Sequence, residues 1–339
     1  MKNFLFTNYT NLYSNLKFDN FSRKFSHFPK VFFYHGVEHN ILDQRVQCNQ
    51  MKFDLFKQQI HYLINNDFNI ISIKEFENRF LENKFIGNEI ILTFDDGYKN
   101  NKNVVFPFLS SLNIPFSIFI STRHIDENLR YPSYKIRSLI YYSDKKKLDL
   151  ISLGKKIKIN SIAEKIKAEK ELINYIKSVS LHKVNSLVFD LDNIHDSYFV
   201  DEIDSNFHSE SPMSWQEIIF LHNNGVEIGS HCHDHVLVHE NQSLIEIQNQ
   251  LIKSKSIISQ KIGNCDYLAY PNGRKKDVSL ISINEAKKAA YNLAFSTNMK
   301  SVKYYDDKYF LPRYIAPQSL NGFKFFVNNF FFDKLNRFI

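Results

Sequence analysis

The most informative stretch of this chain is Ile91-Leu92-Thr93-Phe94-Asp95-Asp96-Gly97-Tyr98. An apolar run stands directly before two adjacent carboxylates and a glycine, which is the pattern of a buried strand that ends in a tight turn. The carboxyl ends of strands carry the active-site residues of α/β proteins. Asp95 and Asp96 are therefore candidate active-site groups, although an Asp-Gly turn without any chemistry has the same sequence.

A second apolar run, over residues 226–229, leads into Ser230-His231-Cys232-His233-Asp234-His235. Two histidines that lie three or four residues apart can converge on one cation, and His231 and His235 have this spacing. One carboxylate with two imidazoles leaves positions on a metal open for water and substrate, as hydrolytic metal sites require. The sequence therefore predicts a site for a divalent metal ion, with zinc as the simplest choice.

Strand-like and helix-like runs alternate along the chain, which predicts an α/β fold. Polar residues gather just beyond each strand-like run. His35 is one of them, and it can either join an active site or only order its loop by hydrogen bonding. The expected strands cover residues 31–34, 89–94, 114–120, 226–229 and 267–270, and the expected first helix covers residues 53–66.

Three motifs in the same order resemble the polysaccharide deacetylases of the NodB-homology type, also called carbohydrate esterase family four. Thr93-Phe94-Asp95-Asp96-Gly97 resembles the first motif of that family, and His231-x-x-x-His235 resembles the second. Tyr270-Pro271-Asn272-Gly273 resembles the third motif in its Tyr-Pro-x-Gly variant. The resemblance implies a distorted (β/α)7 barrel with a helical surface insertion, and an enzyme that removes N-acetyl groups from an acetylated glycan.

The resemblance also assigns roles by position. It implies that Asp96, His231 and His235 bind the metal ion and that Asp95 is the general base. The backbone N–H of Asn272 would stabilise the oxyanion of the tetrahedral intermediate together with the metal. The residues expected to contact the substrate are Tyr98, Tyr270, Pro271, Asn272 and Gly273.

The chain departs from the family pattern in two places. The third motif lacks the arginine that commonly orients the base, and no histidine follows His239 to act as the usual proton donor. Arg313 resembles the late arginine of the Tyr-Pro-x-Gly subgroup and is expected to orient the base through its guanidinium group, with a surface salt bridge as the alternative. His35 resembles the Tyr-His pair that opens many members of this subgroup, so we count it among the candidate catalytic residues.

The chain divides into three segments, of which the second is interrupted. Residues 1–30 are expected to form an N-terminal extension, residues 31–322 the barrel, and residues 323–339 an aromatic C-terminal segment. The aromatic segment is expected to pack in the core or between subunits, with peripheral contact to a membrane surface as the alternative.

An insertion at about 125–210 interrupts the barrel and differs from it in composition. Residues 145–177 are rich in lysine and carry Ile157, Ile162 and Ile166 at helical spacing, whereas residues 190–210 carry only acidic charges. Solvated helix faces are the simplest interpretation of these charges, and a lid that grips the substrate is the alternative.

The composition is that of a globular protein, with 43 Lys and Arg against 36 Asp and Glu and a net charge of +7. This weakly basic balance is not supported by any nucleic-acid-binding motif, so we expect no nucleic-acid partner. The three cysteines lie far apart and suit a reducing compartment. With neither a signal-peptide core nor a membrane-spanning run in the sequence, a cytoplasmic protein is expected.

Three other functions fit part of the pattern. An O-acetyl esterase would use the same site, and a catalytically silent glycan-binding relative would keep the barrel without needing Asp95. A non-haem iron oxygenase also uses two histidines and one carboxylate, but those enzymes usually lie on β sandwiches rather than on alternating strands and helices.

Overall fold

The computed structural model describes residues 28–328, and its centre is a sheet of parallel strands. These strands are β1 (Lys30–Tyr34), β4 (Asn69–Ile70), β5 (Glu89–Phe94), β6 (Ser117–Ile120), β9 (Glu227–Ser230), β10 (Tyr267–Ala269), β11 (Leu293–Phe295) and β12 (Tyr314–Ile315). They are ordered β11-β10-β9-β6-β5-β1-β12, and β4 pairs with β5 beside this path. The seven strands of the path curl into the half-closed wall of a distorted (β/α)7 barrel, so the predicted fold is confirmed.

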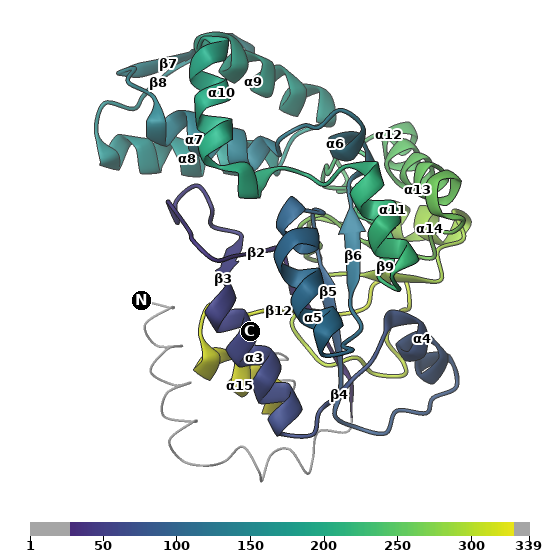
Figure 1. Cartoon of the computed structure of the whole chain (residues 1–339). Helices are drawn as coiled ribbons and strands as arrows, with labels where there is room; N and C mark the ends of the chain where they lie inside the picture. Colours follow the sequence, from purple (N-terminus) through teal and green to yellow (C-terminus); the bar gives the residue numbers. More distant parts are fainter. Residues whose placement is uncertain (1–27, 329–339) are drawn as a thin grey trace.

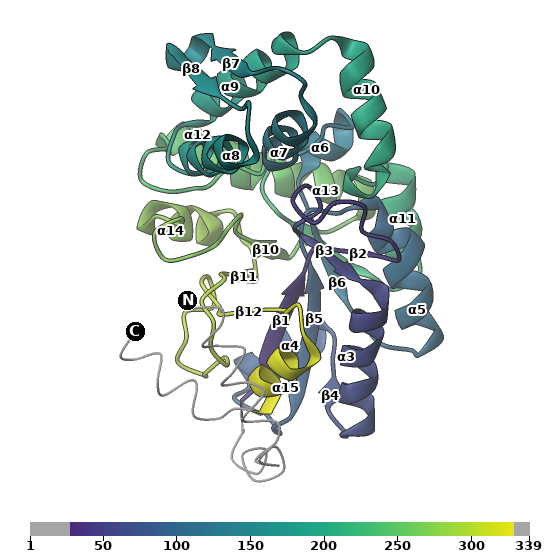
Figure 2. The same cartoon turned by 90° about the vertical axis from the view of Figure 1, so that its left-hand side faces the viewer.

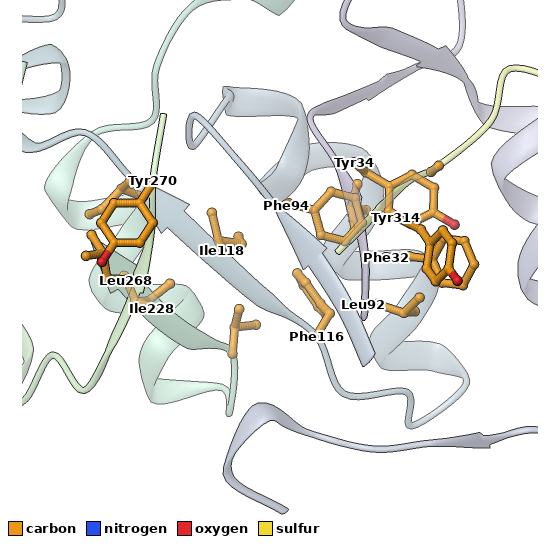
Figure 3. Close-up of a cluster of buried hydrophobic side chains, with 14 of the residues drawn as sticks. Phe32, Tyr34, Leu92, Phe94, Phe116, Ile118, Ile228, Leu268, Tyr270 and Tyr314 are labelled. Atoms are coloured by element: carbon orange, nitrogen blue, oxygen red, sulfur yellow. The ribbon is translucent and has the colours of Figure 1, made fainter. Parts of the chain in front are cut away.

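The sheet buries both of its faces, because successive side chains of a strand point to opposite sides. On one face Phe32 and Leu92 belong to the large cluster beneath the outer helices (Figure 3). On the other face Val31 and Ile91 belong to a separate inner cluster. The same alternation continues beyond Ile91, so that Asp95 follows it on the inner side of the barrel.

Helices connect most of the successive strands and cover the outer face of the sheet, as in strand-helix-strand units, whereas the connection from β11 to β12 contains no helix. Figure 2 shows α3, α5 and α11 side by side along this face. Serine side chains begin several of the helices by accepting a backbone N–H, as Ser72 does for α4 (Ile73–Leu81) and Ser214 does for α11. The covering helices are α3 (Phe53–Asn65), α5 (Phe106–Ser111), α11 (Trp215–Asn223), α12 (Leu244–Gln248), α13 (Ser254–Ile262) and α14 (Leu280–Lys288). In contrast, α4 packs against the inner cluster through Ile73, Phe76 and Phe80.

The insertion forms a layer of its own at the end of the molecule toward which β6 points (Figures 1 and 2). It packs around a hydrophobic cluster that is separate from the two clusters of the barrel. Because the carboxyl ends of the parallel strands meet at this end, the insertion lies above them. Its elements are α7 (Pro132–Tyr142), β7 (Lys147–Leu150), β8 (Lys155–Lys158), α8 (Ile162–Ile176), α9 (Leu181–Ile194) and α10 (Ser197–Asn206).

One expectation about the insertion is wrong. Ile157 lies in an antiparallel hairpin of β7 and β8, not in the helix predicted from its spacing to Ile162 and Ile166. The hairpin turns at Gly154, whose φ of 59° suits glycine. Ile162 and Ile166 do lie on α8, but their side chains are exposed, because that helix buries Ala168 and Leu172 instead.

The aromatic C-terminal segment is described only as far as residue 328. Its first part forms α15 (Leu320–Asn328), which buries Phe323, Phe325 and Phe326 in the large cluster beside α3. These side chains are core residues, and the rest of the segment lies outside the described residues, as do residues 1–27 of the expected N-terminal extension. Within residues 28–328 no helix combines the length and the hydropathy that crossing a membrane requires.

Candidate active site

Asp96, His231 and His235 meet at the carboxyl ends of β5 and β9, which are separated in the sheet only by β6. The Asp96 Oδ1 atom lies 3.1 Å from Nε2 of His235 and 3.5 Å from Nε2 of His231. One potential ligand atom from each residue lies within 4.8 Å of the other two. The structure therefore brings together the three residues that the sequence assigned to metal binding.

The orientation of His231 suits a metal ligand. Its Nδ1 atom lies 2.7 Å from the backbone oxygen of Ala269. A carbonyl oxygen only accepts hydrogen bonds, so Nδ1 carries the proton and Nε2 presents its lone pair toward Asp96. Burial lowers the pKa of His231 to about 4, which keeps the imidazole neutral near pH 7.

The carboxylate of Asp96 provides a test of whether a cation fits. Its Oδ1 atom is buried but accepts no well-directed hydrogen bond from the described residues. Burying a carboxylate oxygen without a partner is costly, and a divalent cation between the three side chains would satisfy it. The donor set of one oxygen and two imidazole nitrogens suits zinc and other divalent metals, so the residues fit the predicted metal.

The backbone around these ligands is strained. Asp96 has a φ of 75°, Cys232 of 64° and His235 of 54°, all in the left-handed region that few residues other than glycine adopt. Gly97 follows with a φ of 69°, so the chain reverses immediately after the two carboxylates. These conformations direct the ligand side chains toward one another and are typical of functional sites.

Asp95 is held by Arg313, whose two terminal nitrogens donate to its two carboxylate oxygens at 2.8 Å each. The guanidinium also donates to the Thr93 hydroxyl at 3.1 Å and to the backbone oxygen of Ser296 at 3.2 Å. Arg313 is completely buried, so the surface salt bridge considered for it is wrong. It reaches Asp95 because it precedes β12, which pairs with β1 beside β5.

This pairing keeps Asp95 ionised. Burial alone would raise the pKa of the carboxyl group, but the positive charge and hydrogen bonds of Arg313, together with the nearby His231 and His35, outweigh it. The net effect is a pKa below the usual value for aspartate. Asp95 can therefore accept a proton at neutral pH while its orientation stays fixed.

The two carboxylates and the two histidines open into one cavity of about 820 Å³. His35 and Asn272 lie in its wall with them. The opposite wall comes from the insertion, through residues of α7, α8 and α9. The cavity is therefore formed jointly by the barrel and the insertion.

Four residues that were expected to contact the substrate are not in the cavity wall. Tyr98 and Tyr270 are fully buried, and the hydroxyl of Tyr270 donates to the backbone oxygen of Tyr309. Pro271 and Gly273 are buried in the same turn as Asn272. Gly273 has a φ of 63°, which a glycine adopts readily. We correct the expectation accordingly: these side chains support the site from behind, because the turn presents Asn272 alone to the cavity.

Some residues of the site carried no recognisable signal in the sequence. Tyr131 lies in the insertion, yet its hydroxyl donates to the backbone oxygen of Asp96 and its ring lies 4.8 Å from that of His235. His124 stacks on Tyr131 with a centroid separation of 4.1 Å. Both positions belong to a segment without a family motif, so only the three-dimensional arrangement could identify them.

Comparisons with known proteins agree with this geometry. The family model described as polysaccharide deacetylase matches residues 82–294, which is more than half of the 339-residue chain. The fold is similar to that of the deacetylase PplD from Streptococcus pyogenes, solved in complex with acetate, at 14% identity and a TM-score of 0.57; the match covers 88% of this chain and 96% of that one. It is also similar to IcaB from Ammonifex degensii, at 15% identity and a TM-score of 0.58, with 89% and 98% covered. A search of curated protein sequences returns no significant match.

Proposed function

Because this chain belongs to the polysaccharide deacetylase family, we propose that it hydrolyses the N-acetyl group of an amino sugar within an oligosaccharide, a polysaccharide or a glycan precursor. The products are acetate and the free amine. The observation that carries this proposal is the convergence of Asp95, Asp96, His231 and His235 in one cavity.

The proposed cofactor is a divalent metal ion, with zinc as the simplest choice, held by Asp96, His231 and His235. When bound, such an ion polarises the acetamide carbonyl and lowers the pKa of water toward about 7. The burial of His231 and of Asp96 favours this role, because few competing water molecules reach the ligand atoms.

Asp95 acts as the general base and removes a proton from the attacking water. Both of its oxygens accept a hydrogen bond from Arg313, but each retains a second lone pair that can take up a proton. Arg313 thus has the role of a positioning residue, since it fixes the direction of the carboxylate and favours its ionised form.

The oxyanion that develops on the acetamide needs hydrogen-bond donors. Asn272 lies in the cavity wall with a φ of 57°, and its backbone N–H donates to no other group among residues 28–328. We assign this N–H to the developing oxyanion. Changing the Asn272 side chain should therefore matter less than changing the shape of the turn.

The leaving amine must gain a proton. We assign this step to His35, which lies in the wall of the same cavity and outside the proposed metal ligands. His124, another imidazole of the wall, is less suitable because burial lowers its pKa to about 4, so it is neutral near pH 7.

The direct test is acetate release by the purified protein from N-acetylglucosamine oligomers and a panel of other N-acetylated glycans. We expect release that a chelator abolishes and an added divalent metal restores. Failure to release acetate from every glycan of the panel, by protein shown to contain metal, would overturn the proposal.

A further inference from the structure

The cavity continues from the metal ligands to the insertion, where two cationic side chains lie in its wall. Lys177 follows the last residue of α8, and Arg274 lies in the loop after β10. Both line the same cavity, and the charge of Arg274 is near enough to lower the pKa of Lys177. We call them the cationic pair.

The other cationic groups of the cavity wall are already neutralised. Their charged groups lie within 3.5 Å of an acidic partner in each case: Arg123 with Asp234, Arg130 with Asp204, Lys135 with Asp192, and Arg137 with Glu169. These ion pairs belong to the architecture of the insertion and of its junction with the barrel. They leave no comparable charge available for a ligand.

The cationic pair is different. The side-chain ammonium of Lys177 forms no hydrogen bond or ion pair with the residues that the structure describes, whereas its backbone N–H donates to the backbone oxygen of Tyr175. The guanidinium Nε atom of Arg274 lies 4.0 Å from Asp277, at the limit of an ion pair, and its side chain is 61% exposed. The buried carboxylate of Asp277 is thus the acidic group near both Lys177 and Arg274.

The surroundings of Lys177 disfavour its charged form. Burial, and then the nearby charge of Arg274, lower the pKa of Lys177. Val184 and Val188 of α9 lie in the same cavity and reduce its polarity, which strengthens electrostatic interactions there.

The cationic pair lies near the proposed site of reaction. Arg274 is only two residues beyond Asn272, so their Cα atoms are at most about 7 Å apart. A group bound there would belong to the reacting sugar or to its immediate neighbour.

We propose that Lys177 and Arg274 bind an anionic group of the substrate, a phosphate or a carboxylate, so that the enzyme acts on an acidic N-acetylated glycan. This inference rests on the proposed deacetylase function for its substrate, but not for the binding of the anion. Two cations on separate elements suit an anion with several oxygens, since each cation can bond to a different one.

The test compares the wild-type protein with the double variant Lys177→Gln/Arg274→Gln. The matched control is Lys170→Gln/Lys275→Gln, which removes the same charge from two exposed lysines of α8 and of the Arg274 loop that are not in the cavity wall. Binding is measured by calorimetry on protein as purified, with equal metal content confirmed in all three forms. The probes are N-acetylglucosamine 1-phosphate, a tetrasaccharide of alternating N-acetylglucosamine and glucuronate, and the neutral N-acetylglucosamine tetramer.

We expect at least one acidic probe to bind the wild type and the control roughly tenfold more tightly than the neutral tetramer does. The variant of the cationic pair should lose this preference. The phosphate and the glucuronate probes distinguish the two kinds of anion. Equal affinity of the variant and the wild type for both acidic probes would overturn the inference.

Acetate release from the same probes separates the two proposals. If acidic probes bind through the cationic pair but no N-acetylated glycan is hydrolysed, the deacetylase proposal fails and the anion site stands. If neutral and acidic glycans are hydrolysed equally well by all three forms, the anion site fails and the deacetylase proposal stands.

Discussion

Arg313 bonds to both carboxylate oxygens of Asp95, 218 positions earlier in the chain, and is itself completely buried. A planar, bidentate contact of this kind fixes both the position and the direction of the carboxylate. The guanidinium of Arg313 also packs against two aromatic rings. Its carbon atom lies 4.7 Å from the ring centroid of Phe33 and 5.5 Å from that of Phe119. The base therefore has little freedom to turn.

Arg313→Lys should test this role. A lysine keeps the positive charge but cannot bond to both oxygens in one plane, so we expect kcat to fall roughly 10- to 100-fold with a smaller change in KM. The control is Arg45→Lys, which alters an arginine-aspartate pair of the surface and should leave kcat unchanged. Steady-state kinetics of acetate release give kcat and KM for both variants, and an unchanged kcat for Arg313→Lys would contradict a positioning role.

Asp95→Asn and Asp96→Asn make the same chemical change on adjacent residues. Asp96→Asn should weaken metal affinity by roughly 100-fold or more, because it removes a charged ligand. Asp95→Asn should retain the metal but lose turnover by roughly 100-fold or more, because an amide is not a base. Metal content and acetate release are measured on both, and equal metal content in the two variants would show that the roles are wrongly divided.

Glu210 should make stability depend on pH. Burial raises its pKa to about 7, while Gln50 donates one hydrogen bond to it at 2.8 Å. The folded protein then binds this proton more tightly than the unfolded chain does, so the contribution of Glu210 to stability is greatest at low pH and decreases as pH rises from about 4.5 through about 7. The shift corresponds to a loss of about 3 kcal/mol.

Glu210→Gln removes this titration. The difference in the free energy of unfolding between wild type and variant should change by about 3 kcal/mol between pH 4.5 and pH 8, with the wild type relatively weaker at pH 8. Urea unfolding of both proteins at several pH values gives this difference. A difference that is constant with pH would mean that Glu210 has an ordinary pKa in the folded protein.

Gly229 should not tolerate a side chain. A Cβ atom at this position of β9 would lie 2.6 Å from the ring of Phe119 and 2.9 Å from the backbone oxygen of Tyr267. Gly229→Ala should therefore lower the free energy of unfolding by about 1–3 kcal/mol, as overpacking in a core does. Thermal unfolding checks this, and an unchanged midpoint would contradict the close packing of β9 against its neighbours.

The barrel could be predicted where its strands are long and apolar. β5 begins and ends at the predicted residues, because both faces of a parallel sheet are buried and the strand is a continuous apolar run. β11 and β12 were not predicted, since strands of three and two residues have no measurable period. Their pairing depends on the closure of the sheet, which local sequence does not determine.

The site could be predicted where motifs adjoin these strands, and not elsewhere. Asp96, His231 and His235 follow strand ends, so their convergence was foreseeable, and it is found. A contribution of the insertion was considered only as the alternative of a lid, and its residues could not be identified, because Tyr131 and Lys177 lie in a segment without a motif. The lysine-rich run 145–177 was interpreted as solvated helix faces, whereas its last residue, Lys177, lines the cavity.

The left-handed backbone at Asp96, His235 and Asn272 has a consequence for any library of substitutions. At these positions a replacement residue has to meet two requirements: its side chain must suit the chemistry of the site, and its backbone must adopt a positive φ. Asparagine and glycine pass the second requirement, whereas valine, isoleucine and threonine fail it. A saturation screen should therefore recover folded but inactive protein from the first group and little soluble protein from the second.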